Sequence, residues 1–334
     1  MQNAEVKTLR PPQTSAITRG TVAMAMMLAC LFALAQAARA ETADAKCVPS
    51  TAANEVTPPP PTWVLAHQPR PADLPRALCP AGEAPASPGR AGPVNARPPL
   101  TQSPRGAGTA QPAFVAPIGA TAPYYYAGDG WRWTSYAGES VNIGIGSPTI
   151  SAGAHSLGQL SVATPSVNFS VELGWHVDPA FGSGPRLFSY INKDHYATNG
   201  QPGGDCYNCG LVTAAGAAFS LNQLLVPGIS LQFGILYNGG NWWISVGNSW
   251  IGYFPGSFWG GAFTSSTWLS AFGEVYDTSG PNSEMGNGIF GSTAGSLVMN
   301  NPLMYPDATT TVTVAGHPTA SDNPYPSSQP NYTV

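Results

Sequence analysis

The segment from Val167 to Val177 alternates between apolar and polar residues with a period of two. Such alternation is typical of a β-strand with one face in a core and the other facing water or a ligand. The pattern therefore predicts a strand whose second face is a candidate functional surface. The apolar face consists of Val167, Phe169, Val171, Leu173, Trp175 and Val177, and the other face carries Asn168, Ser170, Glu172, Gly174 and His176.

The run Ile229–Tyr237 alternates in the same way, and Thr267–Tyr276 alternates between an apolar face and an aromatic face that carries one carboxylate. Clusters rich in glycine, proline and asparagine at 182–185, 200–204, 238–241 and 279–282 separate the runs and predict turns. No segment of helix length shows a period of 3.6 residues. We therefore expect an all-β domain, an antiparallel two-sheet β-sandwich.

Composition divides the chain into four parts. Residues 41–110 hold 15 prolines, whereas eight of the nine Trp, all thirteen Tyr and eleven of the twelve Phe follow residue 110. We expect a Pro/Ala-rich linker or pro-segment at 41–112, a folded domain at 113–310 and a C-terminal tail at 311–334. Exposed arginines in the proline-rich part would invite proteolysis: Arg76, Arg90, Arg97 and Arg105.

The first forty residues have the order of a secretory signal peptide. Lys7, Arg10 and Arg19 precede an apolar run over 21–38, which ends in Ala38-Arg39-Ala40. We expect cleavage near Ala40 and a secreted, extracellular product. A signal anchor is the alternative, because the apolar run is close to membrane-spanning length.

Four cysteines follow the leader: Cys47, Cys79, Cys206 and Cys209. An even number in an exported chain predicts disulfides. Cys206 and Cys209 also have the spacing of half a metal or redox site, but no second such pair exists, so we expect a local disulfide there. The histidines are scattered without metal-ligand spacing, and neither a metal nor an organic cofactor is expected.

Charged residues make up only 9% of the chain, and after residue 110 eleven carboxylates face three cations. No basic patch is available for phosphates, which disfavours a nucleic-acid partner. No later segment is long and apolar enough to span a membrane. We expect a monomer without membrane contact once the leader has been removed.

Two of the four glutamates after residue 110, Glu172 and Glu274, lie on the outward faces of the predicted strands. Glu274 alternates with Trp268, Phe272 and Tyr276, and such apolar surroundings should raise the pKa of its carboxyl group. Two carboxyl groups close together on one concave sheet could share a proton, one acting as base and the other as acid. Ordinary solvated strand residues are the alternative.

Eight short motifs occur in an order that resembles the neprosin family, whose typical member is a secreted glutamic peptidase. The resemblance covers roughly 155–305. The motifs are Val171–Pro179, Arg186–Phe188, Asp194–Tyr196, Cys206–Cys209, Asn241–Trp243, Gly252–Pro255, Phe272–Val275 and Glu284–Gly288.

The resemblance implies a jelly-roll sandwich similar to lectins and glucanases, with Glu172 and Glu274 as the catalytic pair. It also implies an acid-active prolyl endopeptidase that takes peptide or protein substrates, including proline-rich ones, and is made with a pro-segment. Glu284 stands where the family commonly has Gln. We count it as a substrate-binding candidate together with Trp268, Phe272 and Tyr276.

The sequence thus favours a secreted glutamic endopeptidase, with Glu172 as base and Glu274 as acid. A glycoside hydrolase is the first alternative, because paired carboxylates on an aromatic-lined sandwich also suit sugar cleavage. A non-catalytic surface-binding module is the second, because a proline-rich spacer suits attachment to a wall.

Overall fold

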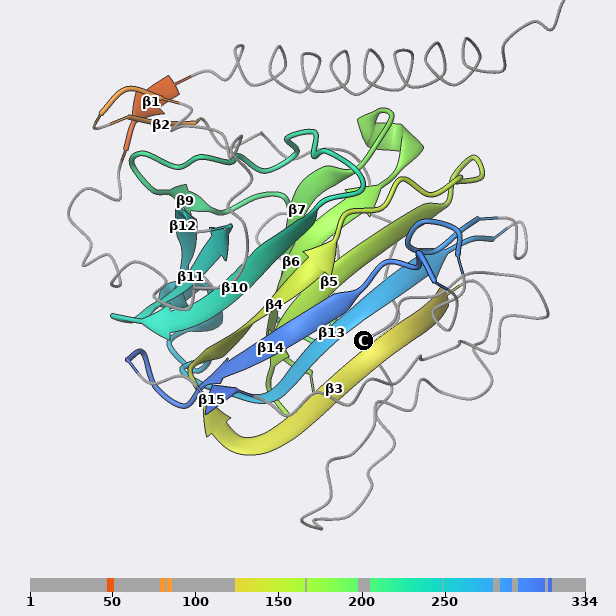
Figure 1. Ribbon diagram of the computed structural model, residues 1–334. Helices are drawn as coiled ribbons and strands as arrows, with labels where there is room; N and C mark the ends of the chain where they lie inside the picture. The colour runs from red at the N-terminus through yellow and green to blue at the C-terminus, as the bar shows by residue number, and fades with distance from the viewer. Residues whose placement is uncertain are drawn as a thin grey trace, which may run out of the picture.

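Figure 1 shows the computed structural model of the chain. The structure describes residues 47–50, 79–81, 83–85, 124–165, 167–197, 205–247, 249–278, 283–289, 294–309 and 312–313. The predicted signal peptide, nearly all of the predicted tail and the predicted turns at 200–204 and 279–282 lie outside these residues. The boundaries predicted for the four parts of the chain stay predictions.

One antiparallel sheet has six strands in the order β3–β13–β5–β6–β7–β8. Its centre is formed by β5, which pairs with β13 on one side and β6 on the other. The strands are β3 (Tyr124–Tyr136), β5 (His155–Ala163), β6 (Ser170–Val177), β7 (Arg186–Asn192), β8 (Cys206–Tyr207) and β13 (Ser266–Tyr276).

The other antiparallel sheet has seven strands in the order β15–β14–β4–β10–β11–β12–β9. The strands are β4 (Gly138–Gly144), β9 (Val212–Thr213), β10 (Ser230–Asn238), β11 (Asn241–Val246), β12 (Ser249–Pro255), β14 (Met299–Tyr305) and β15 (Val312–Thr313).

The two sheets form two layers that enclose one main hydrophobic core (Figure 1). The six-stranded sheet contributes alternate residues of β5, β6, β7 and β13, and the seven-stranded sheet contributes alternate residues of β4 and β10. Fully buried members include Leu160, Leu173, Trp175, Phe233 and Ile235. The fold class predicted from the sequence, an antiparallel two-sheet β-sandwich, is confirmed.

Glycines fix the two sharpest changes of chain direction. Gly138 lies where the chain leaves β3 and enters β4 in the other sheet. Its φ is 157°, and a Cβ atom there would lie 2.0 Å from the carbonyl oxygen of Ile235. Gly239 and Gly240 both have positive φ in the tight turn between β10 and β11, as a two-residue type I′ turn requires. The turn predicted at 238–241 is thereby confirmed.

The three predicted strands are present as β6, β10 and β13, with one correction. The prediction started the first strand at Val167, but β6 starts at Ser170. Val167 has a φ of 51°, a left-handed conformation that a strand residue does not adopt. The outward face of β6 is also buried, although alternation alone predicted contact with water or a ligand.

The proline-rich segment contains a small element of its own. Strands β1 (Cys47–Pro49) and β2 (Glu83–Pro85) pair in antiparallel register, and a disulfide joins Cys47 to Cys79. Ser50 Oγ donates a hydrogen bond to the carbonyl oxygen of Thr213, and the amide of Gly216 donates one to the carbonyl oxygen of Glu83. The element therefore docks beside β9 of the seven-stranded sheet (Figure 1).

Helical structure among the described residues is limited to two short 3₁₀ turns, η2 (Pro179–Phe181) and η3 (Gly256–Trp259). Within that part of the chain, no helix has the length and apolar character needed to cross a membrane.

Candidate functional site

The outer face of the six-stranded sheet, turned away from the main core, carries both predicted catalytic glutamates. On β13 Glu274 lies opposite Leu157 of β5, and on β6 Glu172 lies opposite Ser161 of β5. Leu157 and Ser161 are four residues apart on one strand, so their side chains point to the same face. Glu172 and Glu274 therefore share this face, and each is only 2% exposed.

The register keeps the two carboxyl groups apart. Glu172 and Glu274 are separated by β5 and by four positions along it, which corresponds to about 16 Å between their Cα atoms. Their described partners also draw them in opposite directions, toward His155 for Glu274 and toward Ser170 for Glu172. In this arrangement they do not share a proton, whereas the sequence led us to expect a close pair.

Glu274 lies at one end of the face, beside His155 and near two tyrosine rings. The Nε2 atom of His155 is 2.9 Å from Glu274 Oε1. The His155 ring stacks on Tyr276, with 5.4 Å between the ring centroids, and Tyr276 contacts Tyr124 in turn. Glu274 and His155 thus form a buried pair that can hold or pass a proton.

Glu172 has hydroxyl groups around it. Tyr196 Oη donates a hydrogen bond of 2.9 Å to Glu172 Oε1, and Ser170 Oγ donates one of 3.3 Å to the same oxygen. Hydrogen bonds donated to a carboxylate favour its ionised form. Glu172 therefore has the surroundings of a base.

A further carboxyl group, Asp205, lies beyond Glu172 on the same side of the sheet. Tyr190, which is opposite Glu172 in the sheet, donates a hydrogen bond of 3.4 Å to Asp205 Oδ2. Burial raises the pKa of Asp205 to about 6, although a hydrogen bond from the amide of Lys193 acts against the shift. Burial therefore moves the pKa of Asp205 upward, toward mildly acidic pH.

Gln159 lies between the two glutamates on the outer face of the sheet. It lies on β5 midway between Leu157 and Ser161, so it is the diagonal neighbour of both Glu274 and Glu172. Diagonal neighbours in a sheet are roughly 7–8 Å apart. Phe272 and Gly174 flank Gln159 in the same row, and at Gly174 there is no side chain to fill the face.

The other predicted binding residues divide into two groups. Trp268, Phe272 and Tyr276 lie on the outer face with Glu274, as the alternation predicted. Glu284 belongs instead to the loop before β14. Its carboxylate accepts a hydrogen bond of 2.8 Å from the amide of Thr149, which fastens that loop to the segment before β5. Whether these four residues bind substrate stays a prediction.

Sequence reasoning missed three residues of this face: His155, Tyr196 and Gln159. His155 and Gln159 belong to β5, where apolar residues and glycines obscure the period of two. Tyr196 lies in a loop, where no periodicity exists. A motif containing Tyr196 was visible in the sequence, but nothing in it indicated contact with Glu172.

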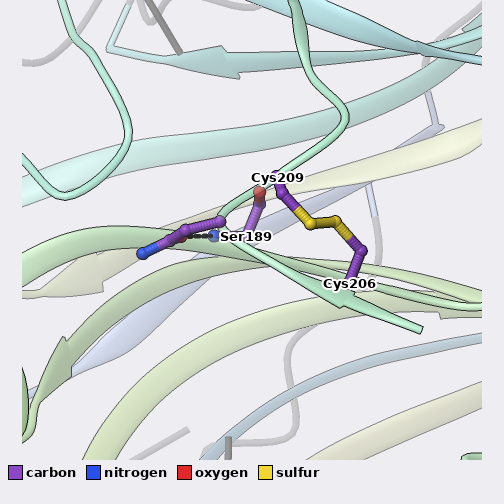
Figure 2. The surroundings of a disulfide bond; sticks show 4 residues. Ser189, Cys206 and Cys209 are labelled. Atoms are coloured by element: carbon purple, nitrogen blue, oxygen red, sulfur yellow. Dashed lines mark hydrogen bonds between the residues drawn. A yellow bond between two sulfur atoms is a disulfide. The ribbon is translucent and has the colours of Figure 1, made fainter. Parts of the chain in front are cut away.

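The second disulfide joins Cys206 to Cys209 beside β7 (Figure 2). Within this short loop Asn208 has a φ of 51°, and its side-chain oxygen accepts a hydrogen bond of 2.9 Å from the amide of Ser189. The local disulfide predicted from the spacing is confirmed, and Cys47 and Cys79 are paired as well. Among the described residues, no three His, Cys, Asp or Glu side chains come together as a metal site.

Residues 152–315 match the model of the Neprosin family. The chain carries a Neprosin domain. The matched segment includes β5, β6 and β13, so Glu172, Gln159 and Glu274 all belong to the Neprosin domain, whereas the β1–β2 element precedes it.

Several solved structures resemble the Neprosin domain weakly. Scytalido-glutamic peptidase with a peptide-based transition-state analogue matches with a TM-score of 0.32 and 7% identity, over 57% of this chain and 87% of that chain. SCP-B of the eqolisin family, in complex with a tripeptide, matches with a TM-score of 0.31 and 7% identity, over 60% and 91%. A Bacteroides ovatus glucan-processing GH16 protein matches with a TM-score of 0.30 and 14% identity, over 46% and 66%. Likenesses this weak carry no inference about the chemistry of this chain.

Proposed function

We propose that this chain is a secreted glutamic endopeptidase in which Glu172 and Glu274 hydrolyse a peptide bond with water. The observation that carries the proposal is the outer face of the Neprosin domain. Two buried glutamates lie there on one sheet, each with a hydrogen-bond partner of its own. The predicted leader and the two disulfides support secretion, because disulfides persist in oxidising compartments.

In the proposed mechanism Glu172 acts as the base. Its carboxylate takes a proton from water as the water attacks the scissile carbonyl carbon. The Glu274–His155 pair holds the second proton, stabilises the carbonyl oxygen as negative charge develops, and later protonates the leaving amine. No metal or organic cofactor takes part in these steps.

The proposed position of the scissile bond is above Gln159, because only there is one peptide bond a diagonal step from both carboxyl groups. For this to happen one oxygen of each carboxyl group must face Gln159 while the other keeps its present partner, His155 for Glu274 and Tyr196 for Glu172. The face must also open to the substrate, because both carboxyl groups are buried. The ring of Phe272, next to Gln159, would pack against a substrate proline. The preference for cleavage after proline is proposed from the family resemblance.

Activity should be greatest in acid. In the working state Glu172 is ionised and the Glu274–His155 pair holds one proton, so a bell-shaped profile of kcat/KM is expected, with its maximum below about pH 6. A maximum near pH 8 with little activity in acid would exclude this mechanism.

Substitution of each glutamate by Gln tests the proposal, because Gln has nearly the same shape but neither takes nor gives the proton. Glu172→Gln and Glu274→Gln should each lower the release of peptides from a proline-containing substrate by about 10²-fold or more. Mass spectrometry of the products at pH 3 to 7 measures this. Glu83→Gln, in the β1–β2 element, is the matched control and should keep wild-type activity.

Two results would contradict the proposal. Retention of more than about a tenth of the activity by either variant would show that the residue is not an essential acid or base. Release of reducing sugars in place of peptides would assign the face to carbohydrate chemistry.

A further inference from the structure

The loop after β7 adopts a strained conformation that brings a hydroxyl group to Glu172. His195 and Tyr196 have φ values of 63° and 61°. Two consecutive non-glycine residues in the left-handed region are rare, because the Cβ atom crowds the backbone there. Strain of this kind persists only where the surroundings fix the chain, and it concentrates at functional sites.

Asn192 and its neighbours hold the strained loop in place. The side-chain oxygen of Asn192 accepts hydrogen bonds from the amides of Asp194 and Tyr196, at 3.2 and 2.9 Å. Its side-chain nitrogen donates to the carbonyl oxygen of Val167, and its own carbonyl oxygen accepts from Trp259 Nε1. One buried residue therefore joins the loop and the approach to β6 through its side chain, and the turn η3 through its backbone carbonyl.

The result of this arrangement is the hydrogen bond of 2.9 Å from Tyr196 Oη to Glu172 Oε1. Tyr196 is buried, and its ring stacks on Tyr190, with 5.9 Å between the ring centroids. If Tyr196 served only to pack against its neighbours, its aromatic ring would be enough. The hydroxyl group adds a directed donor to an otherwise costly buried charge.

We propose that Tyr196 is the positioning residue of Glu172, and that its hydroxyl group keeps the Glu172 carboxylate ionised and oriented for its role as base. This proposal rests on the proposed function and adds a residue to it. Tyr196 acts through Glu172 and needs no contact with the substrate. Removal of its hydroxyl group should make the carboxylate easier to protonate, so the acid limb of the activity profile should move to higher pH.

Other groups near Glu172 can also affect its titration, and they define the controls. Ser170 supplies the longer second donor to the same oxygen. The remaining titratable or charged groups on the neighbouring elements are His155 on β5, His176 on β6, Arg186 and Tyr190 on β7, Asp205 and Tyr207 at β8, and Lys193, Asp194 and His195 in the loop.

Tyr196→Phe is the direct test, with Tyr190→Phe as the matched control. Both variants remove one buried tyrosine hydroxyl group from this face, but the hydroxyl of Tyr190 donates to Asp205. In protein labelled with ¹³C at the glutamate carboxyl carbons, the Glu172 signal is assigned by its absence in Glu172→Gln. Its titration should move to higher pH in Tyr196→Phe and stay unchanged in Tyr190→Phe.

The activity profile gives the second readout. In Tyr196→Phe the acid limb of kcat/KM should move to higher pH in step with the titration, and kcat near pH 3 should fall about tenfold or more, with KM nearly unchanged. Ser170→Ala should move the limb in the same direction by a smaller amount. A purely structural role for Tyr196 would lower the melting temperature without moving either titration.

The outcomes separate this proposal from the proposed function. A Glu172 titration in Tyr196→Phe that matches the wild type overturns the role of Tyr196, whether or not the chain is a peptidase. A shift in Ser170→Ala as large as that in Tyr196→Phe also overturns it. If the wild type cleaves no peptide while the carboxyl signal moves as expected, the proposed function fails and the Tyr196–Glu172 coupling stands.

Discussion

The two faces of the six-stranded sheet are equally buried but chemically opposite. Leu160, Leu173 and Trp175 point inward to the main core, while Gln159 and Glu172, their neighbours in the chain, point outward. All five side chains are almost completely excluded from solvent. Burial alone therefore does not separate the face that holds the sheets together from the face that carries the candidate site.

Three buried glutamates allow the two faces to be compared directly, because two of them lie on the outer face and the third points into the main core. Glu139 on β4 points into the core between the sheets and is 2% exposed, like Glu172 and Glu274. Burial raises the pKa of Glu139 well above its ordinary value, although backbone hydrogen bonds from Ser270 and Ser161 oppose the shift. Its Oε1 atom has no hydrogen-bond partner among the described residues.

The difference lies in the partners. Glu172 has two hydroxyl donors and Glu274 has an imidazole, so each is placed to exchange or stabilise charge. Glu139 has apolar cross-strand neighbours, Ile235 and Met304, and its burial raises the pKa of its carboxyl group. A buried carboxyl group is a candidate for catalysis when titratable or hydrogen-bonding side chains face it. Without such side chains, its burial lowers the stability of the fold.

The largest expected effect on stability comes from substitution of one of two adjacent residues on β5. Leu160→Ala removes a fully buried side chain from the main core and should lower the free energy of unfolding by about 2–5 kcal/mol. Gln159→Leu keeps the side-chain volume on the outer face and should change the free energy of unfolding far less, but it should lower peptide cleavage, because the proposed scissile bond lies above Gln159. Urea unfolding and a peptide assay of both variants measure the two effects. Equal destabilisation by the two would remove the distinction between the faces.

Glu139→Gln should have the next largest effect, and it should stabilise the protein. The folded pKa of Glu139 is raised above the ordinary value of 4.5, so the wild type is most stable below about pH 4.5 and loses stability as pH rises through the folded pKa. Gln does not ionise, so the variant should exceed the wild type at pH 7 and match it at pH 4. Urea unfolding at both pH values measures this, and a less stable variant at pH 7 would contradict it.

Asp205→Asn should have the smallest effect. The folded pKa of Asp205 is about 6 against an ordinary 3.8, so the wild type loses stability as pH rises from about 3.8 to 6, and the loss is constant above that range. The variant should melt at a slightly higher temperature at pH 7 and at the same temperature at pH 3. Calorimetry at the two pH values tests the sign. A lower melting temperature at pH 7 would show that the hydrogen bonds to Asp205 outweigh its desolvation.

The sequence predicted the strands whose two faces differ in polarity. In β6 and β13 the inward apolar residues and the outward glutamates alternate, so the period of two was enough to assign both faces. The error at Val167 arose because an apolar residue in a turn continued the alternation by coincidence. The strand β5 was not predicted, because Gly158 and Leu157 interrupt the alternation of apolar and polar residues on both faces.

The arrangement of the site could not follow from the sequence. Glu172 and Glu274 were found individually, but their separation depends on the pairing of β13 and β6 with β5. The contact of His155 with Glu274 joins residues 119 positions apart. Register is set by the packing of the whole sheet, and a local pattern of hydrophobic residues does not encode it.

The disulfide between Cys47 and Cys79 divides the arginines of the proline-rich segment into two kinds of cleavage site. A cut after Arg76 falls between the two cysteines, so both pieces stay covalently joined, and the nick appears on a gel only after reduction. A cut after Arg90, Arg97 or Arg105 detaches the β1–β2 element as one covalent unit. The hydrogen bonds that then hold it to the domain include those of Ser50 and Glu83 with the 213–216 segment, and such non-covalent contacts allow dissociation on dilution. Gel migration with and without reductant therefore tells a nicked molecule from a trimmed one.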